Sequence, residues 1–422
     1  MPNMKKVIFA AGFGNALEWF DFILYAQFYK MISKHFFPVS DMSEILTMAV
    51  FAAGFLGRPL GALVFGTIGD KFGRRIALIM GIVTMAIPTA AIGLLPSYEQ
   101  IGITSTILLV FMRMMQGFSL GGEFSTCIAY VVEHSPPSNR GFAGSTAFMS
   151  MCIGMLLGSS TSVIMSYYML PEDIMNWGWR LPFIAGLFIG MIGLYIRIKL
   201  SESPLYKAAK ATKQLSASPI KELLRNNWKE LCVGIAIYIT VTTPFFTSTV
   251  YVENFMKNLG YGAGESSITG MSILVTMIII FPISAKFSDM FGRKFVLVTG
   301  AFAIAISTWP AFMGLKGMNF NDAFIAQIAY AAIVAWYMGP VPTVLVELFP
   351  TRVRLTGVAL SYNVSAALFG GTAPMMAMLL QKWLDDKFAI AYYIIALAIF
   401  TLFVLRHYQE SYKKPLIDSE QM

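Results

Sequence analysis

Twelve long apolar segments, separated by short polar stretches, divide this chain of 422 residues. Each is long enough to cross a hydrocarbon core of about 30 Å as an α-helix. A transmembrane barrel would alternate with a period of two, which these continuous runs do not. The expected spans are 7–34, 43–69, 76–96, 102–133, 141–170, 178–198, 229–256, 266–288, 295–315, 322–347, 355–381 and 388–406. We therefore predict an all-α integral membrane protein with twelve transmembrane helices.

The composition agrees with this prediction. Hydrophobic residues make up 56% of the chain and charged residues 13%, and the mean hydropathy is +0.65, well outside the range of soluble domains. If the N-terminus is cytoplasmic, most of the 31 Lys and Arg residues fall in loops on that side. The positive-inside rule then predicts that both termini are cytoplasmic. The net charge of +8 follows from this topology, and we expect a lipid bilayer rather than nucleic acid as partner.

A short motif recurs at matched places in the two halves of the chain. The sequence GTIGDKFGRR ends at Arg75 after the second span, and DMFGRK ends at Lys294 after the eighth, which gives two copies of D-x-x-G-R-[RK]. One copy could merely satisfy the positive-inside rule, but two matched copies favour a structural role. We predict two pseudo-symmetric six-helix halves, 1–198 and 229–422 with a short cytoplasmic tail, joined by a basic cytoplasmic linker, 199–228.

The repeated loops predict a cytoplasmic gate. Glycine permits a tight bend, while the acidic and basic residues can bridge helix ends across the cytoplasmic face. Glu133 and Arg140 after the fourth span also match Glu347 and Arg354 after the tenth, and we interpret both glutamates as gate partners rather than substrate ligands. The predicted gate residues are Asp70, Gly73, Arg74, Arg75, Glu133, Arg140, Asp289, Gly292, Arg293, Glu347 and Arg354.

Charged residues in the central portions of the apolar spans are confined to the N-terminal half. The stretch EWFDF places Glu18 and Asp21 in the first span, and Arg58, Arg113 and Glu123 lie in the second and fourth. Charges at membrane depth are costly, so they should face one another or a cavity. These three acids and two bases sum to −1, and one bound proton would make the cluster neutral. We predict a proton-coupling set of Glu18, Asp21, Arg113 and Glu123.

Some of these charges have alternative roles. Arg58 either holds a substrate carboxylate or only locks the first helix to the second through Glu18 or Asp21. Arg113 either holds a carboxylate or serves the proton relay. Glu123 either takes part in proton coupling or packs a helix end.

The C-terminal half offers an aromatic and polar lining in place of charges. Aromatic rings can bind an ammonium group by cation–π contact while an arginine binds a carboxylate, which suits a zwitterion and also permits a plain carboxylate. Packing is the alternative role for Trp336 and Tyr337. The predicted substrate-binding residues are Tyr25, Arg58, Gln116, Trp336, Tyr337 and Asn363.

The motifs of ATP-driven and metal-dependent catalysis are absent from the sequence. It contains neither G-x-x-x-x-G-K-[ST] nor H-E-x-x-H, so we expect no enzyme activity and no cofactor beyond a proton gradient. A proton-driven efflux antiporter is an alternative, although the fifth span, GMLLGSSTS, lacks the Gly-Pro pair of the usual antiporter motif. A non-transporting membrane sensor is another. We expect a small-molecule substrate and protons as partners, and a functional monomer.

Several motifs resemble a known family. The D-x-x-G-R-[RK] loops and the stretch RMMQG, which begins at Arg113, are similar to motifs of the major facilitator superfamily. The stretches GNALEWFDF, QGFSLGGEF, GWRLPFIAGL and ESPLY resemble its metabolite:proton symporter branch, which includes proline/betaine, 2-oxoglutarate, citrate and shikimate carriers. The stretch PSYEQIGI resembles the proline/betaine members of this branch most.

The resemblance implies uptake of a small polar organic solute by proton symport and alternating access across a bacterial inner membrane. The sequence has no long coiled-coil tail of the kind found in some osmosensing relatives, so it does not predict osmotic sensing either way.

Overall fold

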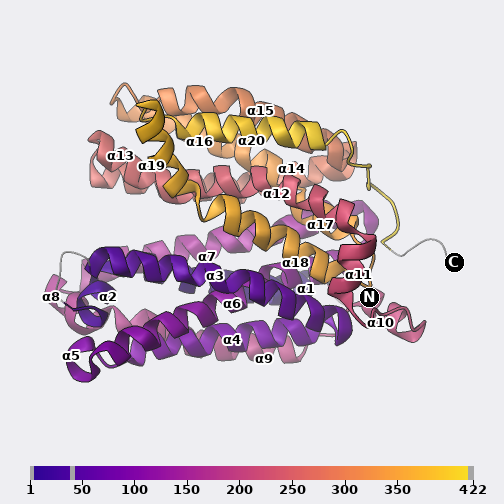
Figure 1. Cartoon of the computed structure of the whole chain (residues 1–422), viewed down its shortest axis with the longest axis horizontal. Coiled ribbons are helices and arrows are strands. Elements are labelled where there is room, and N and C mark those ends of the chain that lie inside the picture. Colours follow the sequence, from indigo (N-terminus) through magenta and orange to yellow (C-terminus); the bar gives the residue numbers. More distant parts are fainter. Residues whose placement is uncertain (1–3, 39–42, 417–422) are drawn as a thin grey trace.

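The computed structural model describes residues 4–38 and 43–416 as a helical bundle. Figure 1 shows the N-terminal part, in indigo and purple, beside the C-terminal part, in orange and yellow. The helices of the N-terminal part are α1 (Met4–Gln27), α2 (Tyr29–Phe36), α3 (Ser43–Lys71), α4 (Arg74–Leu94), α5 (Tyr98–Ile101), α6 (Ile103–Glu133), α7 (Arg140–Tyr168), α8 (Pro171–Asp173) and α9 (Arg180–Ile198).

Two short helices connect the parts, and the second bundle follows. The connecting helices are α10 (Pro204–Ala211) and α11 (Pro219–Asn226). The C-terminal helices are α12 (Trp228–Phe246), α13 (Val252–Leu259), α14 (Ala263–Phe291), α15 (Arg293–Met313), α16 (Phe320–Met338), α17 (Val341–Leu348), α18 (Arg354–Ser365), α19 (Ala373–Leu384) and α20 (Ile390–Val404).

The helices lie where the apolar segments predicted them. Within the described residues, ten helical segments are long and apolar enough to cross a membrane, and α3 and the shorter apolar α20 lie at the second and twelfth predicted spans. The all-helical prediction is confirmed. The first predicted span is divided, because α1 ends at Gln27 and α2 continues from Tyr29.

Three spans of the C-terminal part are interrupted. The seventh contains Pro244, and a π-helical turn, Thr247–Tyr251, follows before α13. The tenth breaks between α16 and α17 at Gly339 and Pro340, and the eleventh has a π-helical turn at Ala366–Gly370. Proline removes a backbone donor and clashes with the preceding turn, so it accounts for the irregularities at Pro244 and Pro340.

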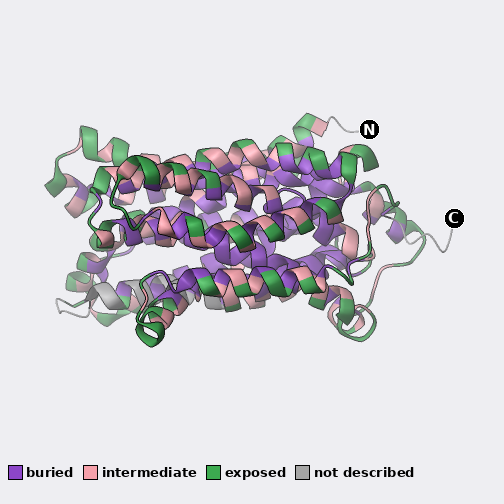
Figure 2. Ribbon diagram, turned by 90° about the horizontal axis from the view of Figure 1, so that it is seen from above, coloured by how far each residue is buried: buried purple, intermediate pink, exposed green. Residues whose placement is uncertain are grey.

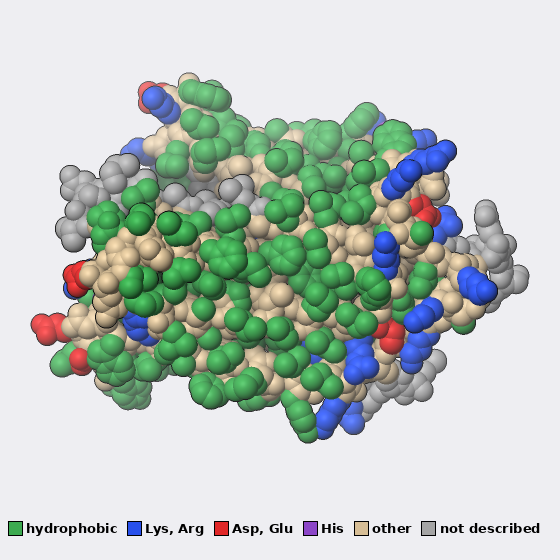
Figure 3. Space-filling view, turned by 60° about the horizontal axis from the view of Figure 1, so that its bottom comes forward, with side chains coloured by type: hydrophobic (Ala, Val, Ile, Leu, Met, Phe, Trp, Pro, Cys, Tyr) green, Lys and Arg blue, Asp and Glu red, His purple; other side chains and the backbone are tan. Residues whose placement is uncertain are grey.

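The surface has the polarity expected of a membrane protein. Both termini lie at the end of the molecule that carries α10 and α11 (Figure 1). In Figure 3 hydrophobic side chains cover the middle of the visible face, and Lys and Arg gather toward that same end. Buried residues fill the interior between the helices, as Figure 2 shows. The positive-inside rule therefore favours a cytoplasmic location for this end.

Glycines bring α3 and α6 into backbone contact. A Cβ atom added at Gly117 would overlap the Gly54 carbonyl, and one at Gly121 would overlap the carbonyl of Arg58. Gly57 and Gly61 of α3 face α6 in the same way. Small residues at this spacing let two membrane helices approach closely. The packing places the carbonyl of Arg58 against Gly121 and holds the two arginine-bearing helices together.

Candidate functional site

Four of the charges predicted within the spans lie buried in the N-terminal part. Glu18 and Asp21 of α1 are 1% and 0% exposed, and Arg58 of α3 and Arg113 of α6 are 0% and 1% exposed. The guanidinium groups of Arg58 and Arg113 are within electrostatic range of each other. Arg58 also acts electrostatically on Glu18. We call Glu18, Asp21, Arg58 and Arg113 the buried charge cluster.

Arg113 contacts neutral partners on α6 and α1. Its Nη1 donates to Oε1 of Gln116 at 2.8 Å, and Nε2 of Gln116 donates to the hydroxyl of Thr89 at 2.7 Å. The guanidinium also lies 4.1 Å from the ring centroid of Tyr25, whose hydroxyl donates to the carbonyl of Thr47 at 3.2 Å. The structure thus brings Tyr25 and Gln116, both predicted site residues, next to Arg113.

In the part of the chain that the structure describes, the two acids of EWFDF accept no hydrogen bond of standard length, although the hydroxyls of Ser119 and Thr89 lie near Glu18 and Asp21, respectively. Asp21 faces Thr89 and Gly186, since a Cβ added at Gly186 would lie 3.1 Å from Oδ1 of Asp21 and 3.3 Å from the Thr89 methyl. A buried ionised carboxylate normally needs donors that replace the lost water.

Glu123 has a basic partner outside the set of charges predicted from the sequence. Arg197, near the end of α9, forms an ion pair with Glu123, and its Nη1 donates to Oε2 of Glu123 at 2.8 Å. Nη1 also donates to the carbonyl of Leu78 at 2.5 Å. Arg197 lies at the end of the predicted span 178–198 and was not counted among the charges within the spans, but it is buried. The predicted sum of −1 is therefore wrong: with Arg197 the interior contains three acids and three bases. The ion pair of Glu123 fits its packing alternative, and its part in proton coupling stays a prediction.

Arg58 connects the buried charge cluster to the C-terminal part. Its Nη1 lies 3.5 Å from the hydroxyl of Tyr362 on α18, and its guanidinium lies 5.7 and 5.3 Å from the ring centroids of Trp19 and Phe22. The ring of Tyr362 is edge-on to that of Tyr238 of α12 at 5.1 Å. Tyr238 and Tyr362 are thus the aromatic residues of the C-terminal part that adjoin the cluster.

The predicted aromatic residues of α16 have other neighbours. Nε1 of Trp336 donates to Thr299 at 3.2 Å, and the indole packs against Phe287, which is 41% exposed. The hydroxyl of Tyr337 donates to the carbonyl of Ile237 at 2.8 Å. These contacts join helices of the C-terminal part to one another. The structure gives Trp336 and Tyr337 the packing role that was their alternative, because their side chains are turned toward α12, α14 and α15.

Asn363 joins the two parts of the molecule. Its Nδ2 donates to the carbonyl of Gly121 on α6 at 2.7 Å and to that of Ala359 at 2.8 Å. The side chain is fully buried, one residue from Tyr362. It therefore fixes α18 against α6 close to the ring that meets Arg58.

A cavity of about 460 Å³ lies between α1, α7 and α13–α14. Phe22 and Tyr25 line it, together with polar residues such as Gln27, Ser159 and Asn254. The same two rings adjoin the guanidinium groups of Arg58 and Arg113. Because Glu253 and Lys257 of α13 also line this cavity, it lies toward the end opposite the termini (Figure 1).

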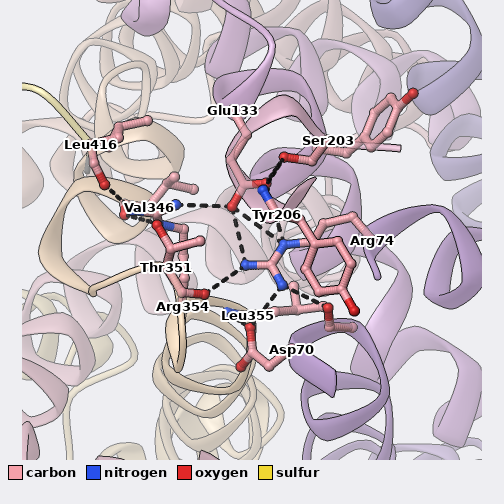
Figure 4. A network of polar contacts seen from close by, with 12 residues as sticks. Asp70, Arg74, Glu133, Ser203, Tyr206, Val346, Thr351, Arg354, Leu355 and Leu416 are labelled. Atoms are coloured by element: carbon pink, nitrogen blue, oxygen red, sulfur yellow. Dashed lines mark hydrogen bonds and ion pairs between the residues drawn. The ribbon is translucent and has the colours of Figure 1, made fainter. Parts of the chain in front are cut away.

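The first D-x-x-G-R-[RK] loop makes a charge network between the two parts (Figure 4). Asp70 accepts hydrogen bonds from the backbone of Leu355 and Thr356 at 3.0 and 2.9 Å. Arg74 forms ion pairs with Asp70 at 3.0 Å and with Glu133 at 3.1 Å. Glu133 in turn pairs with Arg354 of α18 at 3.0 Å. All four charged side chains are buried.

The second copy makes the reciprocal contact. Asp289 accepts from the backbone of Gly141 and Phe142, at the start of α7, at 2.9 and 3.0 Å. Arg293 pairs with Asp289 at 2.7 Å and with Glu347 at 3.3 Å. Each aspartate thus caps the N-terminus of a helix in the other part, where the helix dipole favours an anion.

The symmetry of the two copies is incomplete. Arg354 pairs with Glu133, whereas its counterpart Arg140 donates to the carbonyl of Lys414 at 2.8 Å. Glu347 accepts from Ser411 at 2.6 Å, just as Glu133 accepts from Ser203. Arg354 also reaches the tail, through the carbonyl of Leu416 at 2.7 Å. The tail segment that ends at Leu416 therefore lies against the charge network.

A second repeat, formed by Glu202 and Glu410, was not predicted from the sequence. Glu202 accepts from the backbone of Arg74 at 3.0 Å and of Arg75 at 3.2 Å, and Glu410 accepts from Arg293 and Lys294 at 3.1 and 2.9 Å. Both glutamates precede a serine, and both follow the last helix of their part. The Glu-Ser dipeptide that occurs at both places is the sequence pattern that could have predicted this repeat.

The bend of each loop falls on the predicted glycine. Gly73 has φ of 114° and Gly292 has φ of 100°, a conformation that residues with a Cβ rarely adopt. Arg75 extends from this bend toward α9, where its side chain donates to the carbonyl of Ile198.

Tyr206 of α10 contacts the first loop. Its hydroxyl donates to the carbonyl of Lys71 at 2.6 Å, and its ring lies 5.4 Å from the Arg74 guanidinium. Burial, followed by the charge of Glu202, raises the pKa of the Tyr206 phenol above its usual value. The hydroxyl therefore stays protonated and remains a donor.

A helical bundle with many apolar spans, buried charges in one part and reciprocal charge networks at one end is the organisation of a membrane transporter. The chain matches the family model described as "Sugar (and other) transporter" over residues 7–231 and 210–422. It belongs to this family of the major facilitator superfamily, and it is a multi-pass membrane transporter rather than an enzyme.

Characterised proteins of similar sequence are bacterial. The chain is 34% identical over 426 residues to a glycine betaine/proline/ectoine/pipecolic acid transporter of Dickeya dadantii, covering 98% of this chain and 85% of that protein. It is 35% identical over 428 residues to a proline/betaine transporter of Salmonella typhimurium, with the same coverage of 98% and 85%. The predicted membership of the metabolite:proton symporter branch is confirmed.

Solved structures show the same fold. A proton:xylose symporter bound to 6-bromo-6-deoxy-D-glucose superposes with a TM-score of 0.82 at 18% identity, over 98% of this chain and 97% of that one. A human organic anion transporter superposes with a TM-score of 0.68 at 16% identity, over 96% and 100%.

Proposed function

We propose that this transporter takes up a small zwitterion, such as proline or glycine betaine, by symport with protons. The observation that carries the proposal is the pair Glu18 and Asp21, two buried carboxyl groups that accept no hydrogen bond of standard length from the described residues. They share the N-terminal interior with two buried guanidinium groups. Such carboxyls are suited to carry a proton, since protonation removes the cost of an unsolvated charge.

The charge balance supports binding of a carboxylate after the proton. Glu123 and Arg197 neutralise each other as an ion pair. The buried charge cluster then has two acids and two bases, so one bound proton gives it a charge of +1. A substrate carboxylate would restore neutrality beside Arg58 or Arg113. We therefore assign the coupling proton to Glu18 or Asp21 and the carboxylate to the arginines.

Aromatic rings support recognition of the substrate's ammonium group. Trp19, Tyr238 and Tyr362 lie at or next to Arg58, and ring faces attract quaternary and secondary ammonium ions. The relatives from Dickeya dadantii and Salmonella typhimurium are described as transporters of betaine and proline, which carry both a carboxylate and an ammonium group. These relationships favour a zwitterion over a dicarboxylate.

The arrangement of the gates supports alternating access. We infer that residues 1–198 and 229–422 move as two units joined by the linker 199–228, with both termini cytoplasmic. In this structure the charge networks close the end that carries the termini, while the cavity beside Phe22 and Tyr25 approaches the cluster from the other end. One chain contains the cluster and both networks, so we propose that the monomer is sufficient.

Uptake by purified protein in proteoliposomes tests the proposal. Radiolabelled proline, glycine betaine, 2-oxoglutarate, citrate and shikimate would be offered with an imposed proton gradient, inside alkaline, and again after a protonophore. We expect accumulation of proline or betaine that collapses without the gradient. Accumulation of only a dicarboxylate would reject the zwitterion, and equal rates with and without a gradient would reject symport.

A further inference from the structure

A basic hollow lies beside the linker helix α11, remote from the buried charge cluster. Its volume is about 660 Å³, and it is bounded by Thr67 and Lys71 of α3 and by Ser218, Lys221, Leu224 and Arg225 in and next to α11. Lys71 is partly buried, while Lys221 and Arg225 are exposed. Three cations therefore surround a single opening at the end of the molecule that carries the termini (Figure 1).

These three cations are not ion-paired within the described part of the chain. Glu222, the acid of α11, forms an ion pair with Arg352 at 2.6 Å. Over residues 4–38 and 43–416, Lys71, Lys221 and Arg225 take part in no ion pair. The hollow thus has a local positive charge that is available to an anion.

The hollow is continuous with a lipid-facing stripe of α3. Leu60 and Val64 are 58% and 42% exposed, and with Thr67 and Lys71 they follow helical spacing along one face. Leu224 of α11 is also 55% exposed. Apolar side chains therefore lead along the spanning helix up to the three cations.

The depth of the hollow matches the headgroup region. α11 ends at Asn226, and α12 begins two residues later with Trp228, which is 52% exposed. Exposed tryptophans at the ends of membrane helices lie at the membrane–water interface. Lysine and arginine on the cytoplasmic side of this interface attract anionic lipids.

We propose that this hollow binds an anionic phospholipid of the cytoplasmic leaflet. Lys71, Lys221 and Arg225 hold the phosphate-bearing headgroup, and one acyl chain lies along Val64 and Leu60. Because α11 contacts α3 on one side and reaches Arg352 on the other through Glu222, the bound lipid adjoins both moving parts of the transporter.

Lipid competition on the full-length protein in detergent micelles tests this proposal. Tail-labelled phosphatidylglycerol would be displaced by unlabelled phosphatidylglycerol, phosphatidylcholine or inorganic phosphate. We expect phosphatidylglycerol to compete at least tenfold better than phosphatidylcholine, and millimolar inorganic phosphate not to compete. Binding should also weaken with increasing salt in the unaltered chain. Equal competition by the two lipids, displacement by inorganic phosphate, or salt-independent binding would overturn the proposal.

Two matched variants locate the binding. The change Lys221→Gln/Arg225→Gln should weaken phosphatidylglycerol binding roughly 30-fold at low salt, since each cation near an anionic headgroup contributes about fivefold. Lys207→Gln/Lys210→Gln removes the same charge from exposed positions of α10 outside the hollow and should change binding less than twofold. Equal losses in both variants would show diffuse attraction rather than a site. Arg225→Lys should retain binding within about threefold, and its failure to do so in a folded chain would contradict a headgroup contact based on charge.

Discussion

Asp70 of α3 holds the first turn of α18 through Thr356, whose backbone N–H and hydroxyl donate to the carboxylate at 2.9 and 2.8 Å. Asp289 of α14 holds the first turn of α7 in the same manner. Each contact joins the two halves of the transporter. Opening of the end that carries the termini must break both contacts, so they are direct targets for tests of the proposed gate.

Asp70→Asn and Asp289→Asn should each slow transport while leaving substrate affinity nearly unchanged. Replacement of a carboxylate by an amide weakens charge-assisted hydrogen bonds worth about 1.5–3 kcal/mol, which destabilises the cytoplasm-closed state and slows the return step. Initial rates and binding would be measured separately, with Asp322→Asn, exposed in the first turn of α16, as the control. A large loss of affinity with normal turnover would contradict the gate assignment.

Asp21→Asn or Glu18→Gln should uncouple transport from the proton gradient. Each change imitates the protonated state, so the variant at the coupling residue should still exchange solute across the membrane but fail to accumulate it. Counterflow and net accumulation at matched expression would distinguish these steps. If both variants accumulate solute like the unaltered protein, neither carboxyl carries the proton.

Arg58→Ala should weaken substrate binding. If Arg58 holds the substrate carboxylate, loss of a charge-assisted hydrogen bond of about 1.5–3 kcal/mol raises the dissociation constant roughly tenfold or more. Binding would be measured by scintillation proximity, and Arg406→Ala, at an exposed position after α20, serves as the control. Unchanged affinity would leave Arg58 with only a structural role against Tyr362.

Glu123→Gln and Arg197→Gln should each destabilise the protein, whereas the double variant should recover. Removal of one partner leaves a buried uncompensated charge, at a cost of about 3–5 kcal/mol. Thermal melting in detergent would measure stability, and gradient-driven uptake would measure function. A double variant that folds but cannot accumulate solute would indicate that Glu123 takes part in proton coupling.

Gly117→Ala should prevent α3 and α6 from packing, because the added Cβ would overlap the Gly54 carbonyl. We expect little folded protein in the membrane, as measured by size-exclusion chromatography after extraction. Gly264→Ala on α14 provides the comparison, since no atom lies within 4 Å of its added Cβ. Normal yield of Gly117→Ala would contradict the close approach of these helices.

The sequence predicted the helical fold and the loop repeat because both depend on local patterns. Long apolar runs specify spanning helices, and the glycine at each loop bend requires a positive φ that the structure contains at Gly73 and Gly292. The two copies of the motif also identified Asp70 and Asp289 as equivalent. Which helix each aspartate caps could not be predicted, because that contact depends on how the halves dock.

Arg197 shows why the charge balance could not be predicted. It stands at the end of an apolar run, where an arginine normally extends toward water. In the structure its side chain instead turns into the bundle, between Leu78 and Glu123, where the absence of a Cβ at Gly14 leaves space for the guanidinium. For Trp336, the aromatic side chain suggested a place in the substrate site. The sequence did not indicate which face of α16 the side chain would occupy.

The reciprocal caps at Asp70 and Asp289 have a consequence for energy conservation. If each cap stabilises the closed side by about 2 kcal/mol, each reduces the spontaneously open population about thirtyfold, and two independent caps together reduce it about a thousandfold. An open side without solute would let a protonated carboxyl discharge into the cytoplasm and waste the gradient. Because opening breaks both caps, their free energies add, and duplication of the loop restricts the proposed proton leak multiplicatively.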